Sequence, residues 1–566
     1  MGQLSTLNSK KVMTCKNCHS PFSITDQDQA FYAKAGPNIA GKSYPLKAPT
    51  LCPLCRQQRR MARRNERKLY NRKCDFSGRP IISIFHPNTP FKVYESKVWW
   101  SDDFDGLQYG RDFDFNRPFF DQWAELQADV PRLSLFGKNN DNSDYSNHAD
   151  QLKNCYLVLN GGLAENCLYG NWVVSCRDCV DCSYVDSCEL CYQASYSTHC
   201  YNCQYLWHCD HCSDSRFLYD CKGVSNSLLC VGLRNKSYCL LNQQYTKEEY
   251  DTKIKTLSLA THAQIVGLQK QFEALLRQSP HRALNIVSSE DCTGDNIFNS
   301  KSCTQCFYID GSQDNKYCFD SLNITDCYDV YSAGFDCELQ VETHACNRTK
   351  YSGFCNTCYD DNNIWYCDLC HNSNHLFGCI GLKGNQYCIL NKQYSKEDYE
   401  ALVPKILEHM LKTGEWGEFF PISLSPFAYN ETLAINAFPL TQAQVLSKNW
   451  PWYADPLGSS YQGERVALPE NINDVSDSIL EKILTCEQCE KHYKLIRQEL
   501  NFYRQHQLAL PRACVECRYK DRTAHHNRFQ LYTRPCAQCH TSIETTYPPE
   551  DPTMAVCDSC YQKAVY

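Results

Sequence analysis

The fold is decided by the stretch Cys176-Arg-Asp-Cys179-Val-Asp-Cys182-Ser-Tyr-Val-Asp-Ser-Cys188-Glu-Leu-Cys191. Small or apolar residues stand at every third position, and polar or aromatic residues fill most positions between them. From Cys155 to Cys239 all fourteen cysteines keep this register, in which only Lys236 is neither small nor apolar. Neither a helix of period 3.6 nor a strand of period 2 keeps such a face inside. We therefore expect a solenoid with corners, as in left-handed β-helices with short inward-pointing repeats.

A second spacing, of nine residues, is superimposed on the first, as in Cys191, Cys200 and Cys209. It predicts ladders of like residues stacked on successive coils. The register of three recurs from Cys292 to Cys388 with two one-residue slips, and both halves end alike, in Leu-Leu-Asn-Gln-Gln-Tyr245 and Ile-Leu-Asn-Lys-Gln-Tyr394. Free cysteine is a small, readily buried hydrophobe. We predict that these cysteines form the core of a duplicated solenoid, and metal or iron–sulfur binding is the alternative.

Paired C-x-x-C motifs stand at both ends of the chain. Two such knuckles supply four thiolates to one tetrahedral zinc ion, and a closed site of this kind is usually structural. The sequence therefore predicts three zinc ions, which these residues would bind: Cys15, Cys18, Cys52 and Cys55; Cys486, Cys489, Cys514 and Cys517; Cys536, Cys539, Cys557 and Cys560.

The two ends align with each other. Cys15 and Cys52 match Cys486 and Cys514, and Phe31-Tyr32 matches Phe502-Tyr503. In the same register Cys74 falls on Cys536, whereas Ser77, Tyr94 and Lys97 fall on the other three ligands of the third site. We expect a zinc-free remnant there, held by hydrophobic side chains such as Ile84, Phe85 and Val93. Zinc binding by Cys74 with partners elsewhere is the less favoured reading, because one thiolate cannot build a site.

An arginine-rich helix is expected directly after Cys55. Its arginines recur at the spacing of one helical face, and Lys68, Arg72 and Lys73 extend the basic patch. Aligned arginines repel one another unless a polyanion arrives, and phosphate is the natural ligand of such a stripe. The predicted nucleic-acid contacts are Arg56, Arg59, Arg60, Arg63, Arg64, Arg67, Lys68, Arg72 and Lys73. Neutralisation inside the chain, by the acidic stretch around Asp102 to Asp114, is the alternative.

The matching helix near the carboxy terminus carries about half of this charge. Its positions on the stripe are Arg518, Asp521, Arg522, His525, His526 and Phe529. The amino-terminal helix is therefore the better candidate for binding a polyanion.

Length and composition limit the remaining possibilities. The chain has 566 residues, 40 cysteines and a net charge of −7. It shows no signal-peptide h-region and no apolar run of the ~20 residues that span a bilayer. We expect a cytoplasmic protein with reduced thiols, and a secreted disulfide protein is the alternative. An enzyme is not favoured, because phosphate-binding glycine loops, nucleophile elbows and H-E-x-x-H motifs are missing from the sequence.

The expected fold is mostly β, with a central cysteine-rich β-solenoid in two halves flanked by duplicated treble-clef or zinc-ribbon modules and short helices. The predicted order is 1–100 (a zinc module and a degenerate ribbon), 101–140 (an acidic aromatic connector), 141–243 (the first solenoid half), 244–285 (a helical insertion), 286–391 (the second half), 392–475 (a helix and an aromatic, proline-rich segment) and 476–566 (two zinc modules).

The terminal modules, the Asn-Lys-Gln-Tyr394 ending and the segment Gly414-Glu-Trp-Gly417-Glu-Phe-Phe-Pro421 resemble an uncharacterised bacterial family of cysteine-rich zinc-ribbon proteins. The likeness covers most of the chain and implies the architecture only. From the residues we expect a zinc-binding, non-enzymatic protein that binds nucleic acid, RNA or the ribosome rather than DNA. A protein-interaction scaffold with structural zinc is the alternative, and neither a membrane nor a small-molecule substrate is expected.

Overall fold

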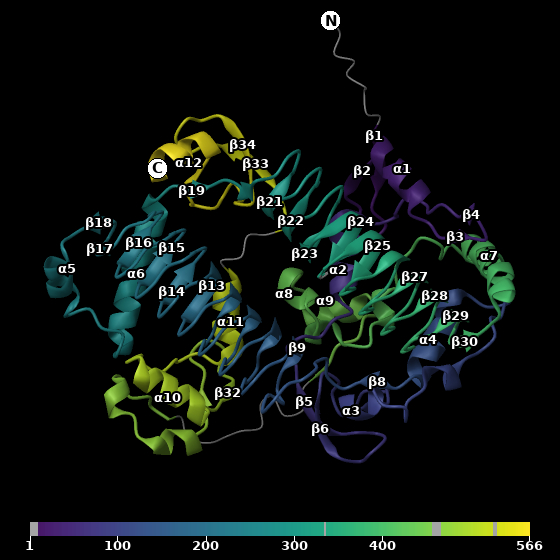
Figure 1. Ribbon diagram of the computed structural model, residues 1–566, viewed down its shortest axis with the longest axis horizontal. Helices are drawn as coiled ribbons and strands as arrows, with labels where there is room; N and C mark the ends of the chain where they lie inside the picture. The colour runs from purple at the N-terminus through teal and green to yellow at the C-terminus, as the bar shows by residue number, and fades with distance from the viewer. Residues whose placement is uncertain (1–9, 333–334, 455–465, 525–528) are drawn as a thin grey trace, which may run out of the picture. The chain divides into compact units, whose positions relative to one another are not determined.

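The computed structural model describes residues 10–332, 335–454, 466–524 and 529–566. The chain forms two compact units, each built from two separate stretches. Unit 1 combines Met1–Ser134 with Asn285–Tyr453, and unit 2 combines Leu135–Leu284 with Ala454–Tyr566. The amino-terminal zinc module therefore shares a unit with the second long sheet of the chain. The carboxy-terminal zinc modules share a unit with the first long sheet (Figure 1).

Stack 1, in unit 2, is a ten-stranded sheet whose strands follow one another in chain order. Its strands are β9 (Asn147–Asp150), β10 (Leu159–Gly162), β11 (Asn171–Val174), β12 (Ser183–Asp186), β13 (Tyr192–Thr198), β14 (Gln204–Trp207), β15 (Arg216–Tyr219), β16 (Leu228–Val231), β17 (Cys239–Leu240) and β18 (Gln243–Gln244). All neighbours pair in parallel except β17 and β18, which close the stack as an antiparallel hairpin.

One coil of stack 1 is twelve residues long. Leu159 pairs with Asn171, and Asn171 pairs with Ser183. Within one coil, Lys153, Tyr156, Leu159 and Gly162 all pair in parallel with the residues twelve positions later. Each coil thus bonds to the next at four points, three residues apart. The prediction that like residues stack at a spacing of nine is wrong, because the stacking step is twelve.

Residues nine apart contact each other in another way. Inward thiols donate hydrogen bonds to the carbonyl nine residues ahead, as from Cys155 Sγ to Ala164 O (3.4 Å) and from Cys182 Sγ to Cys191 O (3.5 Å). That carbonyl lies on the next coil, three residues before the residue that stacks on the cysteine.

Every third residue of the stack takes a left-handed backbone conformation. The φ angle is 52° at Leu157, 53° at Asn160 and 57° at Tyr169. Residues other than glycine adopt this region at a cost of ~1–3 kcal/mol each, and asparagine and aspartate adopt it most readily. The repeated bonds between coils offset this cost, and the repeated bend turns one side chain in three to the inside.

Stack 2, in unit 1, is an eleven-stranded sheet of the same kind. Its strands are β20 (Ile286–Val287), β21 (Gly294–Phe298), β22 (Cys306–Asp310), β23 (Phe319–Leu322), β24 (Ile324–Tyr331), β25 (Cys337–His344), β26 (Lys350–Gly353), β27 (Asn362–Trp365), β28 (Asn374–Phe377), β29 (Gln386–Ile389) and β30 (Lys392–Gln393). The two slips in the sequence appear as one step of eleven, from Ile286 to Ile297, and one of thirteen, from Ile324 to Cys337.

The inward cysteines of both stacks are reduced and buried. None of the 40 cysteines forms a disulfide in the described residues, and of the stack cysteines only Cys292 is more than marginally exposed. Cysteine, valine and alanine side chains fill the inside of stack 1 in one continuous cluster. This arrangement agrees with the prediction that these cysteines form a core.

The remaining elements of unit 1 belong to the amino-terminal modules and to the cover of stack 2. They are β1 (Lys10–Thr14), β2 (Pro21–Thr25), α1 (Asp26–Lys34), β3 (Asn38–Ile39), β4 (Lys42–Ser43), α2 (Pro53–Met61), β5 (Tyr70–Lys73), β6 (Pro80–Ser83), β7 (Val93–Tyr94), α3 (Ser96–Trp99), η1 (Gly106–Tyr109), α4 (Phe119–Asp129), β8 (Arg132–Leu133), α7 (Lys396–Thr413), η2 (Ile422–Leu424), η3 (Tyr429–Glu431), α8 (Ala434–Ala437) and α9 (Gln442–Ser447).

Those of unit 2 are α5 (Lys247–Ile254), α6 (His262–Gln278), β19 (His281–Arg282), η4 (Ile472–Asp474), η5 (Asp477–Glu481), β31 (Leu484–Thr485), β32 (His492–Tyr493), α10 (Arg497–Gln505), α11 (Val515–Ala524), β33 (Tyr532–Pro535), β34 (Ser542–Thr545), β35 (Ala555–Val556) and α12 (Asp558–Val565).

The aromatic segment after α7 packs on stack 2. The Trp416 ring lies 5.9 Å from that of Trp365, and the Tyr366 hydroxyl accepts a hydrogen bond from Gly417 N. The end of this segment, residues 455–465, lies outside the described residues. Among the described helices, none has both the length and the apolar character needed to cross a bilayer.

Burial predicts the order in which the stack thiols react. Under native conditions iodoacetamide should label Cys292 well before the other stack cysteines, because the alkylating agent must reach the sulfur. Peptide mass spectrometry over a time course measures this order, and labelling in guanidinium provides the fully reactive control. Rapid native labelling of most stack cysteines would contradict a closed thiol core.

Candidate metal centres

Three groups of four cysteines converge as the sequence predicts. In each group all four Sγ atoms lie within 4.8 Å of one another. The distance between Cys18 Sγ and Cys52 Sγ is 3.6 Å, and the matching distances are 3.7 Å for Cys489 with Cys514 and 3.6 Å for Cys539 with Cys557. A zinc ion at ~2.3 Å from four sulfurs needs S···S edges of about 3.8 Å. The donor set and its spacing therefore fit tetrahedral zinc.

The local fold explains the convergence in the first group. Cys15 and Cys18 lie in the turn between β1 and β2, and Cys52 is the N-cap of α2, with Pro53 in the first turn. The Cys52 backbone N–H donates to Cys15 Sγ (3.2 Å). A helix N-terminus and N–H donors both favour a thiolate, which is the form that binds zinc.

The carboxy-terminal groups repeat this geometry. Cys514 N donates to Cys486 Sγ (3.2 Å), and Cys557 N donates to Cys536 Sγ (3.3 Å). The third group is the most open of the three: Cys539 is exposed, and Cys557 and Cys560 are half-buried. None of the stack cysteines belongs to a candidate metal group among the described residues.

The amino-terminal counterpart of the third group keeps its shape without the ligands. Cys74 Sγ accepts hydrogen bonds from Ser77 N (3.4 Å) and Glu95 N (3.3 Å). Glu95 is the N-cap of α3, as Cys557 is of α12. Glu95 and Val98 therefore occupy the positions of Cys557 and Cys560, and the prediction that Tyr94 and Lys97 occupy them is wrong by one residue.

Hydrogen bonds link the groups that stand in for the lost ligands. The Ser77 hydroxyl donates to Glu95 Oε1 at 2.5 Å, which joins the two knuckles directly. Burial opposes a charge on Cys74, but the bonds from Ser77 outweigh it and hold the pKa of this thiol below its usual range. Ile84, Phe85 and Val93 are buried beneath the module, as expected for a core that replaces the metal.

The predicted nucleic-acid contacts lie mostly in the interior of unit 1. The exposed fraction is 0 % for Arg60, 1 % for Arg56 and Arg63, 6 % for Arg64 and 7 % for Arg59. Arg67, Lys68 and Arg72 are half-buried, and Lys73 is exposed. The helix itself ends at Met61, so the arginines beyond it do not continue the expected stripe.

Carboxylates neutralise the buried arginines of α2, which lies beside β24 and β25 (Figure 1), and most of these carboxylates belong to stack 2. Arg56 lies 2.8 Å from Asp329, and Arg59 lies 2.8 Å from Glu342 and 2.9 Å from Glu418. Burial opposes the charge of Arg56, yet Asp329, Tyr32 and Glu342 together outweigh it and raise the pKa of Arg56. We call Arg56, Arg59, Arg60, Asp329, Glu342 and Glu418 arginine cluster 1.

Arg63 is held differently. Its guanidinium lies over the rings of Phe420 (4.7 Å) and Trp123 (5.2 Å) and 3.6 Å from the Asp368 carboxylate. Burial lowers its pKa to about 10. Arg132 shares Asp368 at 2.9 Å, so two guanidinium groups converge on one carboxylate.

Unit 2 contains a matching arrangement. Arg518, which follows Cys517 as Arg56 follows Cys55, lies 3.0 Å from Asp181 and 3.1 Å from Glu499. Arg522 lies 2.9 Å from the same Asp181. We call these four residues arginine cluster 2. His525 and His526 of the expected stripe lie outside the described residues.

These contacts differ from those that either reading of the arginine-rich helix predicts. Phosphate oxygens cannot reach guanidinium groups that are buried on carboxylates. Neutralisation within the chain occurs, but its partners are stack carboxylates and not the stretch around Asp102 to Asp114, where Asp102, Asp103 and Asp105 are exposed. Sequence reasoning missed Asp181 and Asp329; both are stack corners with positive φ (55° and 59°), and their distant partners leave no local signal.

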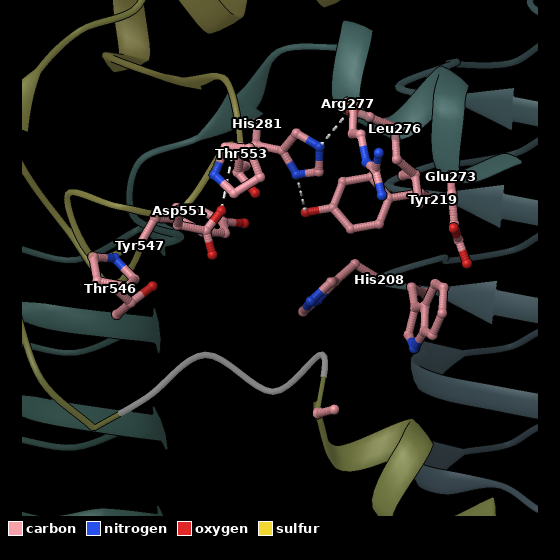
Figure 2. A pocket seen from close by; sticks show the side chains of 14 residues that line it. His208, Tyr219, Glu273, Leu276, Arg277, His281, Thr546, Tyr547, Asp551 and Thr553 are labelled. Carbon is pink, nitrogen blue, oxygen red and sulfur yellow. Dashed lines mark hydrogen bonds between the residues drawn. The ribbon is translucent and has the colours of Figure 1, made fainter. Parts of the chain in front are cut away.

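Unit 2 also contains a cavity of about 350 Å³ (Figure 2). His281 lies at its edge, where Nδ1 is 3.0 Å from the Tyr219 hydroxyl and Nε2 is 3.0 Å from Leu276 O. Burial lowers the pKa of His208, which also lines the cavity, to about 4. Because both nitrogens of His281 are engaged, the imidazole belongs to the wall and gives the cavity no chemistry of its own.

Comparison with known proteins identifies one segment. A family model described as a probable treble clef domain matches residues 10–64, which form the first zinc module. No curated protein matches the chain. The match and the cysteine groups together support a cysteine-rich zinc-binding protein that contains a treble clef domain.

The zinc-free remnant should accept a metal when its ligands are restored. The variant Ser77→Cys, Glu95→Cys, Val98→Cys should bind one zinc ion more per chain than the wild type, because Cys74 already stands where the fourth thiolate is needed. Metal analysis by mass spectrometry of the purified proteins measures the difference. The matched variant Ser77→Cys, Tyr94→Cys, Lys97→Cys should gain none, and equal zinc contents in all three proteins would refute the alignment.

Removing one carboxylate should loosen only its own unit. Asp329→Asn removes the carboxylate that pairs with buried Arg56 in unit 1, and Asp181→Asn removes the one that pairs with buried Arg522 in unit 2, at a cost of about 3–5 kcal/mol each. Hydrogen exchange should rise in α2 for the first variant and in α11 for the second. Each serves as the control for the other, and Glu165→Gln, which removes an exposed partner of Lys153, should change neither. Unchanged exchange in α2 and α11 would show that the clusters do not hold the modules.

Proposed function

We propose that this protein is a non-enzymatic, zinc-dependent scaffold for protein partners. The observation that carries the proposal is the burial of the module arginines on stack carboxylates. Zinc-thiolate modules of this size have little core of their own and depend on the metal for folding. Zinc would therefore orient the helices α2 and α11, which follow the second cysteine pairs, and the arginines of each helix would hold it against its stack.

The proposal also takes each stack to be a four-sided β-solenoid. Its support is the regular step of twelve, with parallel pairing at four positions of each coil. Repeat proteins of this kind present extended regular faces, which are commonly used to bind other proteins. On stack 1 one such face carries a ladder of alternating charge, where Lys153 lies 2.7 Å and Arg177 lies 3.8 Å from Glu165.

Protein is favoured over nucleic acid as the partner. The strongest basic feature of the sequence is buried and neutralised in arginine cluster 1, and the chain as a whole carries a net charge of −7. Binding to a polyanion depends on accessible cations that release counterions. Of the predicted contacts only Lys73 is fully exposed.

Affinity capture from native lysate tests this function. The zinc-loaded full chain, used as bait, should retain specific proteins after nuclease treatment, and the purified bait should show the low 260/280 absorbance ratio of a protein free of nucleic acid. A chain carrying both Asp329→Asn and Asp181→Asn is the matched bait and should lose those partners. Release of the partners by nuclease, or a raised absorbance ratio that falls with salt, would identify nucleic acid as the ligand instead.

A further inference from the structure

Two histidines and an aspartate meet on an exposed side of stack 1, far in sequence from the zinc modules. His199 and His211 are twelve residues apart and so occupy the same corner of successive coils, with φ angles of 52° and 51°. Their rings are stacked, with centroids 4.5 Å apart and planes inclined by 20°. Asp210 precedes His211, and its carboxylate lies beside both rings.

The three side chains present their ligand atoms to one point. Asp210 Oδ1 is 2.8 Å from His211 Nδ1 and 3.4 Å from His199 Nδ1, and all three ligand atoms lie within 4.8 Å of one another. A metal ion at ~2.0–2.1 Å from nitrogen and oxygen needs ligand atoms about 3.3 Å apart in a tetrahedral arrangement. The two distances from Asp210 Oδ1 bracket that value, and all three ligand atoms lie within 4.8 Å, so side-chain rotations can bring them to coordinating positions.

The scaffold holds these ligands in place. Thr198 Oγ1 donates to Asp210 Oδ1 (2.8 Å), which orients the carboxylate. The backbone beneath is bonded coil to coil, as from His211 N to Thr198 O (3.1 Å) and from His199 N to Asp186 O (3.0 Å). Ligands on rigid elements lose little freedom when an ion binds.

We propose that His199, Asp210 and His211 form an exchangeable binding site for a divalent transition-metal ion of the zinc class. Imidazole and carboxylate donors suit Zn²⁺, Ni²⁺ and Co²⁺, whereas the four-thiolate groups select zinc in closed structural sites. The side chains of His199 and His211 are 53 % and 66 % exposed, so water or an external ligand can complete the coordination. This site does not depend on the scaffold function, because it uses no residue of the zinc modules or of the arginine clusters.

Co²⁺ added to the zinc-loaded full chain tests the site. We expect one additional equivalent, visible as ligand-field absorption without the thiolate-to-cobalt charge-transfer band that a cysteine site produces. His199→Asn and His211→Asn should abolish this absorption, and asparagine keeps the positive φ of the corner. Asp210→Asn should weaken Co²⁺ binding by roughly tenfold or more.

Asp186→Asn is the matched control. Asp186 pairs with Thr198 and Thr198 with Asp210, so it presents an exposed carboxylate two coils earlier on the same side, but serine follows it where histidine follows Asp210. This variant should bind Co²⁺ like the wild type, and circular dichroism melts should confirm that all variants fold. Absence of ligand-field absorption, equal binding by the histidine variants, or a spectrum dominated by thiolate charge transfer would each overturn the proposal.

Discussion

The narrow coil is the constraint on which the rest of this structure depends. Successive repeats of twelve residues pair in parallel, every third residue bends through the left-handed region, and every third side chain is buried. The enclosed space admits cysteine, alanine, serine and valine readily, and the interior of stack 1 consists mainly of such residues. Cysteine suits this core because its sulfur fills a small apolar space while its weak S–H donor reaches a backbone carbonyl.

The same geometry places carboxylates on the surface of each stack that its zinc module covers. Corner residues point away from the core, and aspartates at two corners, Asp181 and Asp329, each receive two arginines. Buried ion pairs are expensive to desolvate and add little net stability compared with apolar packing, but they penalise any misplaced partner strongly. In this protein they lie between each zinc module and its stack. Each unit therefore joins segments that are distant in the sequence.

The third cysteine group and its amino-terminal counterpart share one backbone geometry, although only the first of the two has four cysteines. The sulfur of Cys536 accepts an N–H from the start of α12, and the sulfur of Cys74 accepts the equivalent N–H from the start of α3. In the second case a hydroxyl–carboxylate bond between Ser77 and Glu95 joins the two knuckles where the first has cysteines. Buried apolar side chains around Val93 also stabilise this module, so its fold does not depend on a metal alone.

The sequence by itself determined the cysteine groups, the duplication and the inward register of three, because each depends on local spacing or on a short repeat. The coil length was misjudged, since nine and twelve are both multiples of three and only the pairing of strands distinguishes them. The role of the arginine-rich helix was decided by tertiary structure alone. A stripe of arginines has the same spacing whether it faces solvent or Asp329, and the carboxylates that neutralise it are more than 260 residues away in the sequence. The meeting of His199 with His211 likewise depends on the step of twelve, which fixes the corner that each histidine occupies.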